Sequence, residues 1–249
     1  MYPYFNIDEK LLKLAEQAEA QAAPYFKRVE EIQRYNQQKM QAAFMNAGVS
    51  ESHFAGSTGY GYDDAGREVL DKVFAYALGA EDAIVRHNFV SGTHTLTVAL
   101  FGVLRPGDKM LCVTGTPYDT LLGVIGLTGN GMGSLREWGV EYSQVDLLPD
   151  GTVDLEGIEK TVDDSYKMVY IQRSRGYSLR PSLHIAEIEE IIKVVRKKAP
   201  NTIIMVDNCY GEYVEKIEPV SVGADLMAGS LIKNPGGGIA PTGGYIAGR

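Results

Sequence analysis

Short apolar runs alternate with longer stretches of helical periodicity along most of the chain. In the longer stretches, apolar residues recur every three or four positions, the spacing that is typical of amphipathic helices. This alternation predicts β-α-β units around a parallel sheet. We expect seven strands, at 83–86, 109–113, 141–145, 168–172, 202–207, 226–229 and 243–247.

The helical patterns fill the intervals between these runs. We expect helices at 65–78, 94–103, 117–126, 155–161 and 185–198. The predicted fold class is therefore α/β, a three-layer αβα arrangement around a seven-stranded and mostly parallel sheet. Ligands of such sheets bind outside the carboxyl ends of the strands, so candidate chemistry is sought just after each apolar run.

The N-terminal part of the chain has a different pattern. Residues 7–46 are helical in periodicity but polar for their length, and Pro24 predicts a break between two helices. We interpret residues 1–55 as a helical arm and 56–249 as the main domain. Because a lone helix of this composition is only marginally stable, we expect the arm to pack on another subunit or on the back of the sheet.

Composition narrows the class of protein. The chain has 249 residues, of which 45% are hydrophobic, and a net charge of −8. This charge argues against nucleic acid as a partner. The basic stretch at 193–198 is read as a solvated helix face. Two cysteines beside apolar runs favour reduced thiols, and no metal-ligand spacing, signal peptide or long apolar segment is present. A cytoplasmic enzyme that does not enter a membrane is expected.

Small residues follow the first predicted strand and begin a helix. Ser91, Gly92 and Thr93 would present backbone N–H groups and the positive end of the helix dipole to an anion. An ordinary N-cap by Ser91 or Thr93 explains the same residues. Ser230, at the end of the sixth run, could add a hydroxyl to a phosphate site.

Three more side chains follow other strands. Tyr118 could stack on a planar ligand, although simple side-chain contact explains it equally well. Asp207 ends a strongly apolar run, where a carboxylate needs a cationic partner or else caps the next loop. Lys233 follows the sixth run in a half-buried setting that would favour a nucleophilic amine. Pyridoxal 5'-phosphate (PLP) enzymes need a lysine and an acid of this kind.

Together these residues resemble the fold type I PLP-dependent enzymes of the Cys/Met-metabolism branch, which includes cystathionine β-lyase and methionine γ-lyase. The similarity is greatest to the methionine γ-lyase-like group often labelled aluminium-resistance proteins. It extends over about 59–249 and rests on the order Ser-Gly, Tyr, Asp-Asn and Ser-x-x-Lys.

The resemblance implies a role for each matching residue. Lys233 would be the catalytic Schiff-base lysine, Asp207 the partner of the pyridine nitrogen and Tyr118 the stacking ring. The phosphate would be bound at the start of the helix after Ser91, by Gly92 and Thr93, with Ser230. The implied cofactor is PLP, the implied substrate is an amino acid, and the implied assembly is a homodimer or homotetramer.

The sequence departs from the family pattern at several positions. Relatives carry a tyrosine and an arginine before the first strand that reach a neighbouring subunit's phosphate, whereas the loop at 59–63 has tyrosines only. Cys209 and Ile232 replace hydroxyl residues. Gln172 or Arg173 is expected to replace an asparagine that contacts the cofactor's phenolic oxygen.

The function implied is β- or γ-elimination from a sulfur-containing amino acid by a PLP-dependent carbon–sulfur lyase. Transamination or aldol cleavage on the same scaffold, or a noncatalytic binding or assembly domain, are the alternatives. The sequence ends soon after the seventh run, so we interpret it as a cofactor-binding large domain without the smaller C-terminal domain. That domain supplies the arginine for the substrate carboxylate in relatives, and we expect the isolated chain to be incomplete for catalysis.

Overall fold

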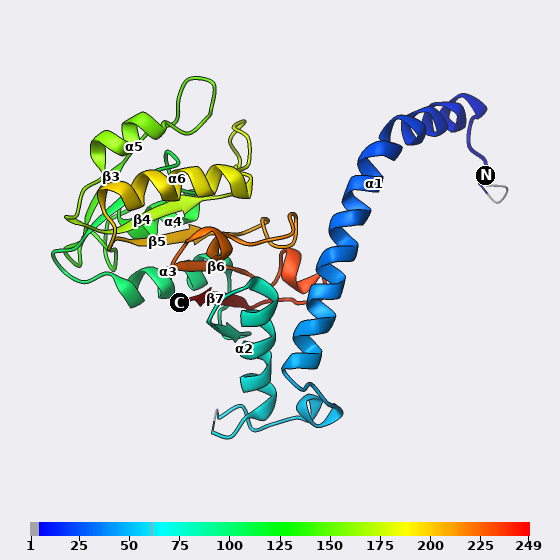
Figure 1. Cartoon of the computed structure of the whole chain (residues 1–249), viewed down its shortest axis with the longest axis horizontal. Coiled ribbons are helices and arrows are strands. Elements are labelled where there is room, and N and C mark those ends of the chain that lie inside the picture. Colours follow the sequence, from blue (N-terminus) through cyan, green and yellow to red (C-terminus); the bar gives the residue numbers. More distant parts are fainter. Residues whose placement is uncertain (1–4, 61) are drawn as a thin grey trace.

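A seven-stranded sheet forms the middle layer of the computed structural model, which describes residues 5–60 and 62–249 (Figure 1). The strand order is β1-β7-β6-β5-β4-β2-β3. β7 is antiparallel to both its neighbours, and the other pairs are parallel. All the predicted runs form strands, with ends within two residues of the expected ones. The strands are β1 (Asp82–Arg86), β2 (Lys109–Cys112), β3 (Glu141–Gln144), β4 (Tyr166–Gln172), β5 (Ile203–Asp207), β6 (Leu226–Ser230) and β7 (Gly244–Gly248).

Helices cover both faces of the sheet, which confirms the three-layer prediction. The helices are α2 (Ala65–Leu78), α3 (Gly92–Val103), α4 (Asp119–Ile125), α5 (Leu155–Thr161) and α6 (Ile185–Lys198). Residues of α2, α5 and α6 share one buried cluster, and those of α3 and α4 share the other. Short 3-10 helices lie at η1 (Glu51–Phe54), η2 (Pro219–Val222) and η3 (Asn234–Gly236). α3 begins two residues earlier than predicted, since the Ser91 side chain accepts the N–H of His94.

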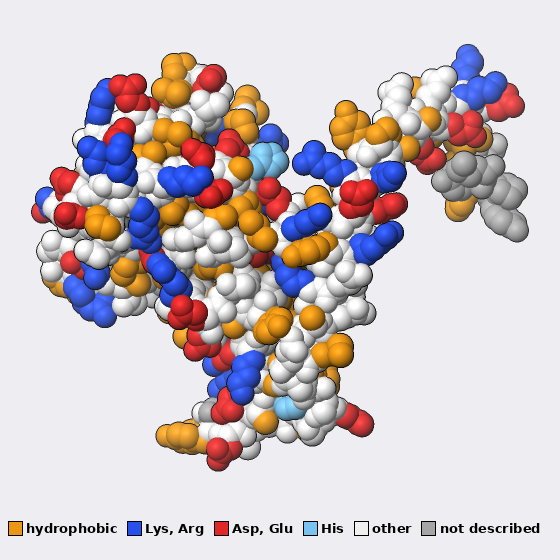
Figure 2. All heavy atoms as spheres, in the orientation of Figure 1, with side chains coloured by type: hydrophobic (Ala, Val, Ile, Leu, Met, Phe, Trp, Pro, Cys, Tyr) orange, Lys and Arg blue, Asp and Glu red, His pale blue; other side chains and the backbone are white. Residues whose placement is uncertain are grey.

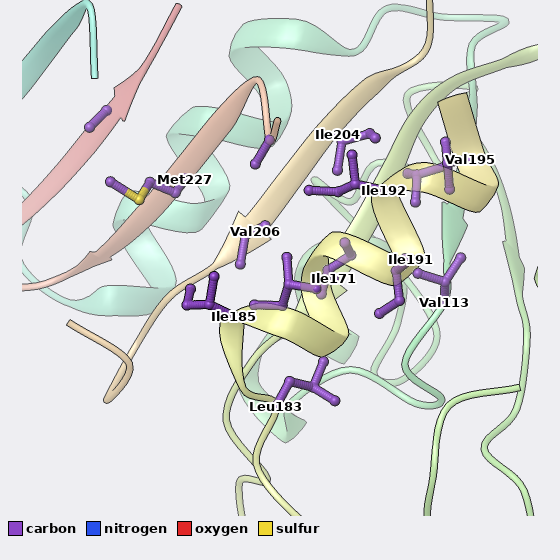
Figure 3. Close-up of a cluster of buried hydrophobic side chains, with 14 of the residues drawn as sticks. Val113, Ile171, Leu183, Ile185, Ile191, Ile192, Val195, Ile204, Val206 and Met227 are labelled. Atoms are coloured by element: carbon purple, nitrogen blue, oxygen red, sulfur yellow. The ribbon is translucent and has the colours of Figure 1, made fainter. Parts of the chain in front are cut away.

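The contact of α6 with the central strands belongs to the larger of the two buried clusters at the sheet (Figure 3). Ile185, Ile191 and Ile192 of α6 are buried against β4, β5 and β6. Each such side chain contributes about 1.5–3 kcal/mol when fully buried. The opposite face of α6 is solvated, as predicted, and there Lys193 pairs with Glu190 at 3.0 Å. The apolar periodicity of α6 therefore predicted its buried face correctly.

The predicted break at Pro24 is wrong. Residues Glu9–Asn46 form one helix, α1, with Pro24 inside it. Pro24 has no N–H group and so cannot donate a helical hydrogen bond. The strong helix formers Gln, Glu and Ala on both sides of it nevertheless continue the helix. Figure 1 shows α1 bending towards its N-terminal end and standing away from the rest of the domain. No helix within residues 5–60 and 62–249 is long and apolar enough to span a membrane.

The C-terminal part of α1 contacts α2 and a loop rather than the sheet itself. Ala43 is buried with Val73 and Ala77 of α2. The Asn36 side chain donates hydrogen bonds to the carbonyl oxygens of Tyr213 and Glu215, at 2.9 and 3.0 Å. The N-terminal part of α1 exposes both charged and apolar side chains (Figure 2).

Candidate functional site

Asp207 and Lys233 lie at the carboxyl ends of the neighbouring strands β5 and β6. Asp207 is paired with Gln172 of β4 on one side and with Ala228 of β6 on the other. β6 ends at Ser230, so Lys233 follows it by three residues. The positive charge of Lys233 is near enough to influence the pKa of Asp207. The fold therefore brings these two predicted residues to the same edge of the sheet.

Asp207 is a buried carboxylate, with 3% of its surface exposed. It accepts hydrogen bonds from the Tyr170 hydroxyl at 3.2 Å and from the Cys209 N–H at 3.1 Å. Burial raises the pKa of Asp207. The two hydrogen bonds and the charge of Lys233 offset only part of this rise. No cation of the described residues forms an ion pair with it. It caps the following loop and also suits a cationic ligand nitrogen.

Lys233 rests on an aromatic ring. Its Nζ atom lies 3.6 Å from the centroid of the Tyr210 ring. Tyr210 has a φ of 66°, which is strained for a residue with a bulky side chain. The side-chain amide of Asn234 donates to the carbonyl oxygens of Tyr210 and Glu212, at 3.1 and 2.9 Å. These bonds tie the Lys233 segment to the loop that follows Asp207.

The start of α3 forms the third part of the site. The Ser91 hydroxyl caps the helix, as the simpler interpretation predicted, while the N–H groups of Gly92 and Thr93 have no hydrogen-bond partner in the described chain. A Cβ atom on Gly92 would lie 3.3 Å from Cβ of Ser230 and 3.5 Å from Sγ of Cys209. Gly92 thus lets the helix start approach the ends of β5 and β6 closely, and its free N–H groups suit a phosphate.

The hydroxyl groups expected at the phosphate site already have partners. The Thr93 hydroxyl lies 2.6 Å from the Thr120 hydroxyl. Ser230 is fully buried, and its hydroxyl is 3.4 Å from both the Gly243 carbonyl and the Ile232 N–H. The backbone of Gly92 and Thr93 is therefore the part of this site that remains free for a ligand.

Tyr118 lies at the start of α4, as predicted. Its N–H donates to Oε1 of Gln172 at 2.6 Å, and its ring centroid is 5.6 Å from that of Tyr177. A hydrogen bond to Tyr177 and then burial raise the pKa of Tyr118 to about 12. The phenol is therefore neutral near pH 7, and its ring is half-buried beside the strand that adjoins Asp207.

The side chains of Gln172 and Arg173 both have hydrogen-bond partners within the described chain. The Gln172 side chain bridges the Tyr118 N–H and the Ser174 carbonyl. Arg173 is only 2% exposed and donates to Asn208 Oδ1 and Gly211 O, each at 2.8 Å. The guanidinium is thus committed to holding the loop after β5 rather than to a ligand.

An arginine does lie beside the tyrosine loop before β1. The guanidinium of Arg67, in the first turn of α2, donates to the Gly59 carbonyl at 3.1 Å. Tyr60 and Tyr62 are exposed, with ring centroids 5.3 Å apart, whereas Gly61 lies outside the described residues. The loop at 59–63 does not contain this arginine, because Arg67 belongs to helix α2.

Two buried groups near Asp207 were not anticipated. Tyr170 is in the middle of β4, and its hydroxyl reaches Asp207 across the strand pair. Glu212 is fully buried, with Oε1 accepting from the Tyr245 hydroxyl at 2.9 Å and Oε2 unpartnered in the described structure. A polar residue inside an apolar run was the available signal for Tyr170. Glu212 had no such signal.

Glu212 should make stability pH-dependent. Burial raises its pKa from 4.5 to about 8. At pH values between these two, the unfolded state has released the proton and the folded state has not. The free energy of unfolding should therefore fall by about 1.4 kcal/mol for each unit by which the pH rises. Glu212→Gln should flatten this slope, which urea unfolding at pH 5, 6.5 and 8 measures. An equally steep slope in the variant would contradict the assignment.

The sequence is similar to those of several known proteins. Residues 11–249 match the family model described as methionine gamma-lyase. A Bacillus subtilis protein named YnbB, of uncharacterized function, is 48% identical over all of this chain and 59% of its own length. The L-methionine gamma-lyase of Pseudomonas putida is 28% identical over 78% of this chain and 44% of its own length.

Solved structures of similar proteins share the fold. One from Clostridium acetobutylicum, described only provisionally as a cystathionine beta-lyase involved in aluminium resistance, has 53% identity and a TM-score of 0.93, covering 99% of this chain and 59% of its own. A provisionally described counterpart from Listeria monocytogenes has 50% identity and a TM-score of 0.91, covering 94% and 57%. The chain thus spans about three-fifths of the length of such relatives. On the family match, this chain belongs to the methionine gamma-lyase family.

Proposed function

We propose that this protein binds PLP and cleaves a carbon–sulfur bond of an amino acid substrate. The observation that carries the proposal is the pair at the ends of β5 and β6. It consists of a buried carboxylate that forms no ion pair with any described residue, and a lysine close enough to affect the pKa of that carboxylate. Membership of the methionine gamma-lyase family supports the same chemistry.

Each part of the site would hold one part of the cofactor. The N–H groups of Gly92 and Thr93 would bind the phosphate, and Asp207 would keep a proton on the ring nitrogen. Tyr118 would place its ring against the cofactor. When bound, PLP supplies an electron sink for the carbanion that forms at the α-carbon. The Lys233 amine would move the α-proton as general base.

The family match favours a lyase over the other reactions of this scaffold. Fold alone does not distinguish elimination from transamination or aldol cleavage. Incubating the full-length protein, loaded with PLP, with a panel of amino acids and assaying thiol, ammonia, keto acid and aldehyde separates these reactions. We expect thiol release; keto acid formation without thiol would support an aminotransferase instead.

Borohydride reduction of the PLP-loaded protein tests the site. We expect mass spectrometry to find the modification on Lys233, because its amine lies at the strand edge with Asp207. Lys216→Ala is the matched control, since Lys216 also lies over a tyrosine ring, with Nζ 5.6 Å from the centroid of Tyr35. This variant should be labelled normally and Lys233→Ala should not. Modification of another lysine in the unaltered protein would refute the site, and no PLP uptake would favour a noncatalytic assembly domain.

We also propose that the protein is a homodimer or homotetramer in which α1 contacts another copy. The supporting observation is that α1 exposes large apolar side chains. Tyr25, Phe26 and Val29 are 74%, 55% and 62% exposed. An isolated helix gains little stability without such contacts, so covering this surface would stabilise the arm.

A further inference from the structure

A cavity of about 280 Å³ lies beside Tyr118, between the start of α4 and the loop that follows β4. Tyr118 and Tyr177 form part of its wall, and Thr116 adds a hydroxyl group. Arg175 and Arg180 also line it, and Asp119 contributes the carboxylate among the lining residues. The wall therefore carries two guanidinium groups for one carboxylate.

Arg180 is a buried cation that is held by carbonyl groups instead of a carboxylate. Only 8% of its surface is exposed. Its guanidinium donates to the carbonyl oxygens of Gln172 at 2.8 Å, Pro181 at 2.9 Å and Ser174. None of the ion pairs in the described residues includes it. Arg180 thus fixes the path of the loop, and its guanidinium has no ion-pair partner among the described residues.

Arg175 is the free cation of the same loop. Its side chain is exposed and has no hydrogen bond or ion pair within the described part of the chain. Its backbone is held in a turn, because the N–H and hydroxyl of Ser178 donate to its carbonyl at 3.1 and 2.7 Å. Gly176 continues this turn with a φ of 59°. The side chain is therefore carried on an ordered turn while its charge remains available to a ligand.

The cavity adjoins the proposed cofactor site. Gln172 lines the cavity and is paired in register with Asp207. Neighbouring strands lie about 4.8 Å apart. Lys233 rests on the Tyr210 ring at the end of the next strand, β6. An amino acid that reacts near Lys233 could therefore extend one of its groups into the cavity.

We propose that this cavity is a carboxylate subsite for the substrate, in which Arg175 binds the anion and Arg180 shapes the loop. Arginine suits this task because its planar guanidinium can donate two hydrogen bonds to one carboxylate. The rings of Tyr118 and Tyr177 would pack against the methylene groups of the substrate that adjoin this carboxylate. The carboxylate could be that of the reacting amino acid or one carried beyond the sulfur. The substrate assignment rests on the proposed lyase function, whereas anion binding does not.

Binding of glutarate to the PLP-free protein tests the subsite without catalysis. We expect calorimetry to detect binding of glutarate but not of dimethyl glutarate, which lacks the charges. Loss of a hydrogen bond to a charged group should weaken glutarate binding in Arg175→Gln by about tenfold or more. Arg136→Gln is the control, because Arg136 is exposed and lies outside the cavity. Equal binding by Arg175→Gln and the unaltered protein, or binding of inorganic phosphate alone, would overturn the proposal.

The source of the carboxylate is tested by KM in the PLP-loaded protein. If Arg175 binds the carboxylate of the reacting amino acid, Arg175→Gln should raise KM for methionine and for S-(2-carboxyethyl)cysteine by the same factor. If it binds a group beyond the sulfur, only the second KM should rise. Unchanged KM for both would refute a substrate subsite. Arg175-dependent glutarate binding without any thiol release from the full-length protein would instead refute the lyase and leave the anion subsite standing.

Discussion

Asp207→Asn should lower the turnover of the PLP-loaded protein by about a hundredfold or more, the usual effect of removing one charge-stabilising group from an active site. The carboxamide oxygen can still accept the Cys209 N–H, and its NH2 group can donate to the Tyr170 hydroxyl oxygen instead of accepting from it, so the local structure should persist. What it loses is the negative charge that would hold a proton on the ring nitrogen. Initial rates of thiol release at saturating substrate measure this effect.

The same substitution should not weaken the PLP-free protein. Burial raises the pKa of Asp207 above its value in the unfolded chain. At pH values above the unfolded-state pKa, the carboxylate therefore lowers the free energy of unfolding. Removing the charge should leave the free energy of unfolding at pH 7 unchanged or higher. Glu212→Gln is the control, because it replaces another buried carboxyl group near Asp207, one that keeps its proton near pH 7, and it should keep turnover. Normal turnover in Asp207→Asn would rule out the proposed role.

The strand-end residues could be predicted because the sheet itself determines where they lie. β4 and β5 are buried on both faces, so they appear as continuous apolar runs whose ends are easy to locate. Asp207 is the last residue of β5, and Tyr118 follows the end of β2 by six residues. Lys233 is separated from its strand by only two residues. Short-range sequence information was therefore sufficient to place them at one edge.

Residues whose roles depend on contacts distant in the sequence could not be placed in this way. Arg173 directly follows a strand, as Asp207 ends one, but its side chain turns into a buried cluster with Glu218. That cluster depends on the path of the loop after β5. Pro24 shows the converse, since a strong local signal for a break was overcome by its helix-forming neighbours. Local patterns determined the sheet edge but not which polar side chains face it.

The buried cluster behind the site explains why this loop holds its shape. Arg173 pairs with Glu215 at 2.7 Å and with Glu218 at 3.5 Å. Glu218 is 1% exposed, and its other oxygen accepts the Tyr213 N–H at 2.9 Å. Burial raises the pKa of Glu218, while its hydrogen bonds and the charge of Arg173 act in the opposite direction. Lys39 of α1 also favours the ionised form, so the arm and the site share this electrostatic cluster.

Arg173→Met should therefore reduce the free energy of unfolding by about 3–5 kcal/mol, because it leaves a buried carboxylate without its cation. Urea unfolding at pH 7 measures the loss, with Arg136→Met as an exposed control that should stay within about 0.5 kcal/mol of the unaltered protein. Adding Glu218→Gln to Arg173→Met should recover part of the stability, since the uncompensated charge is then removed as well. A loss below about 1 kcal/mol in Arg173→Met, or strict additivity in the double variant, would mean that Arg173 and Glu218 are not coupled.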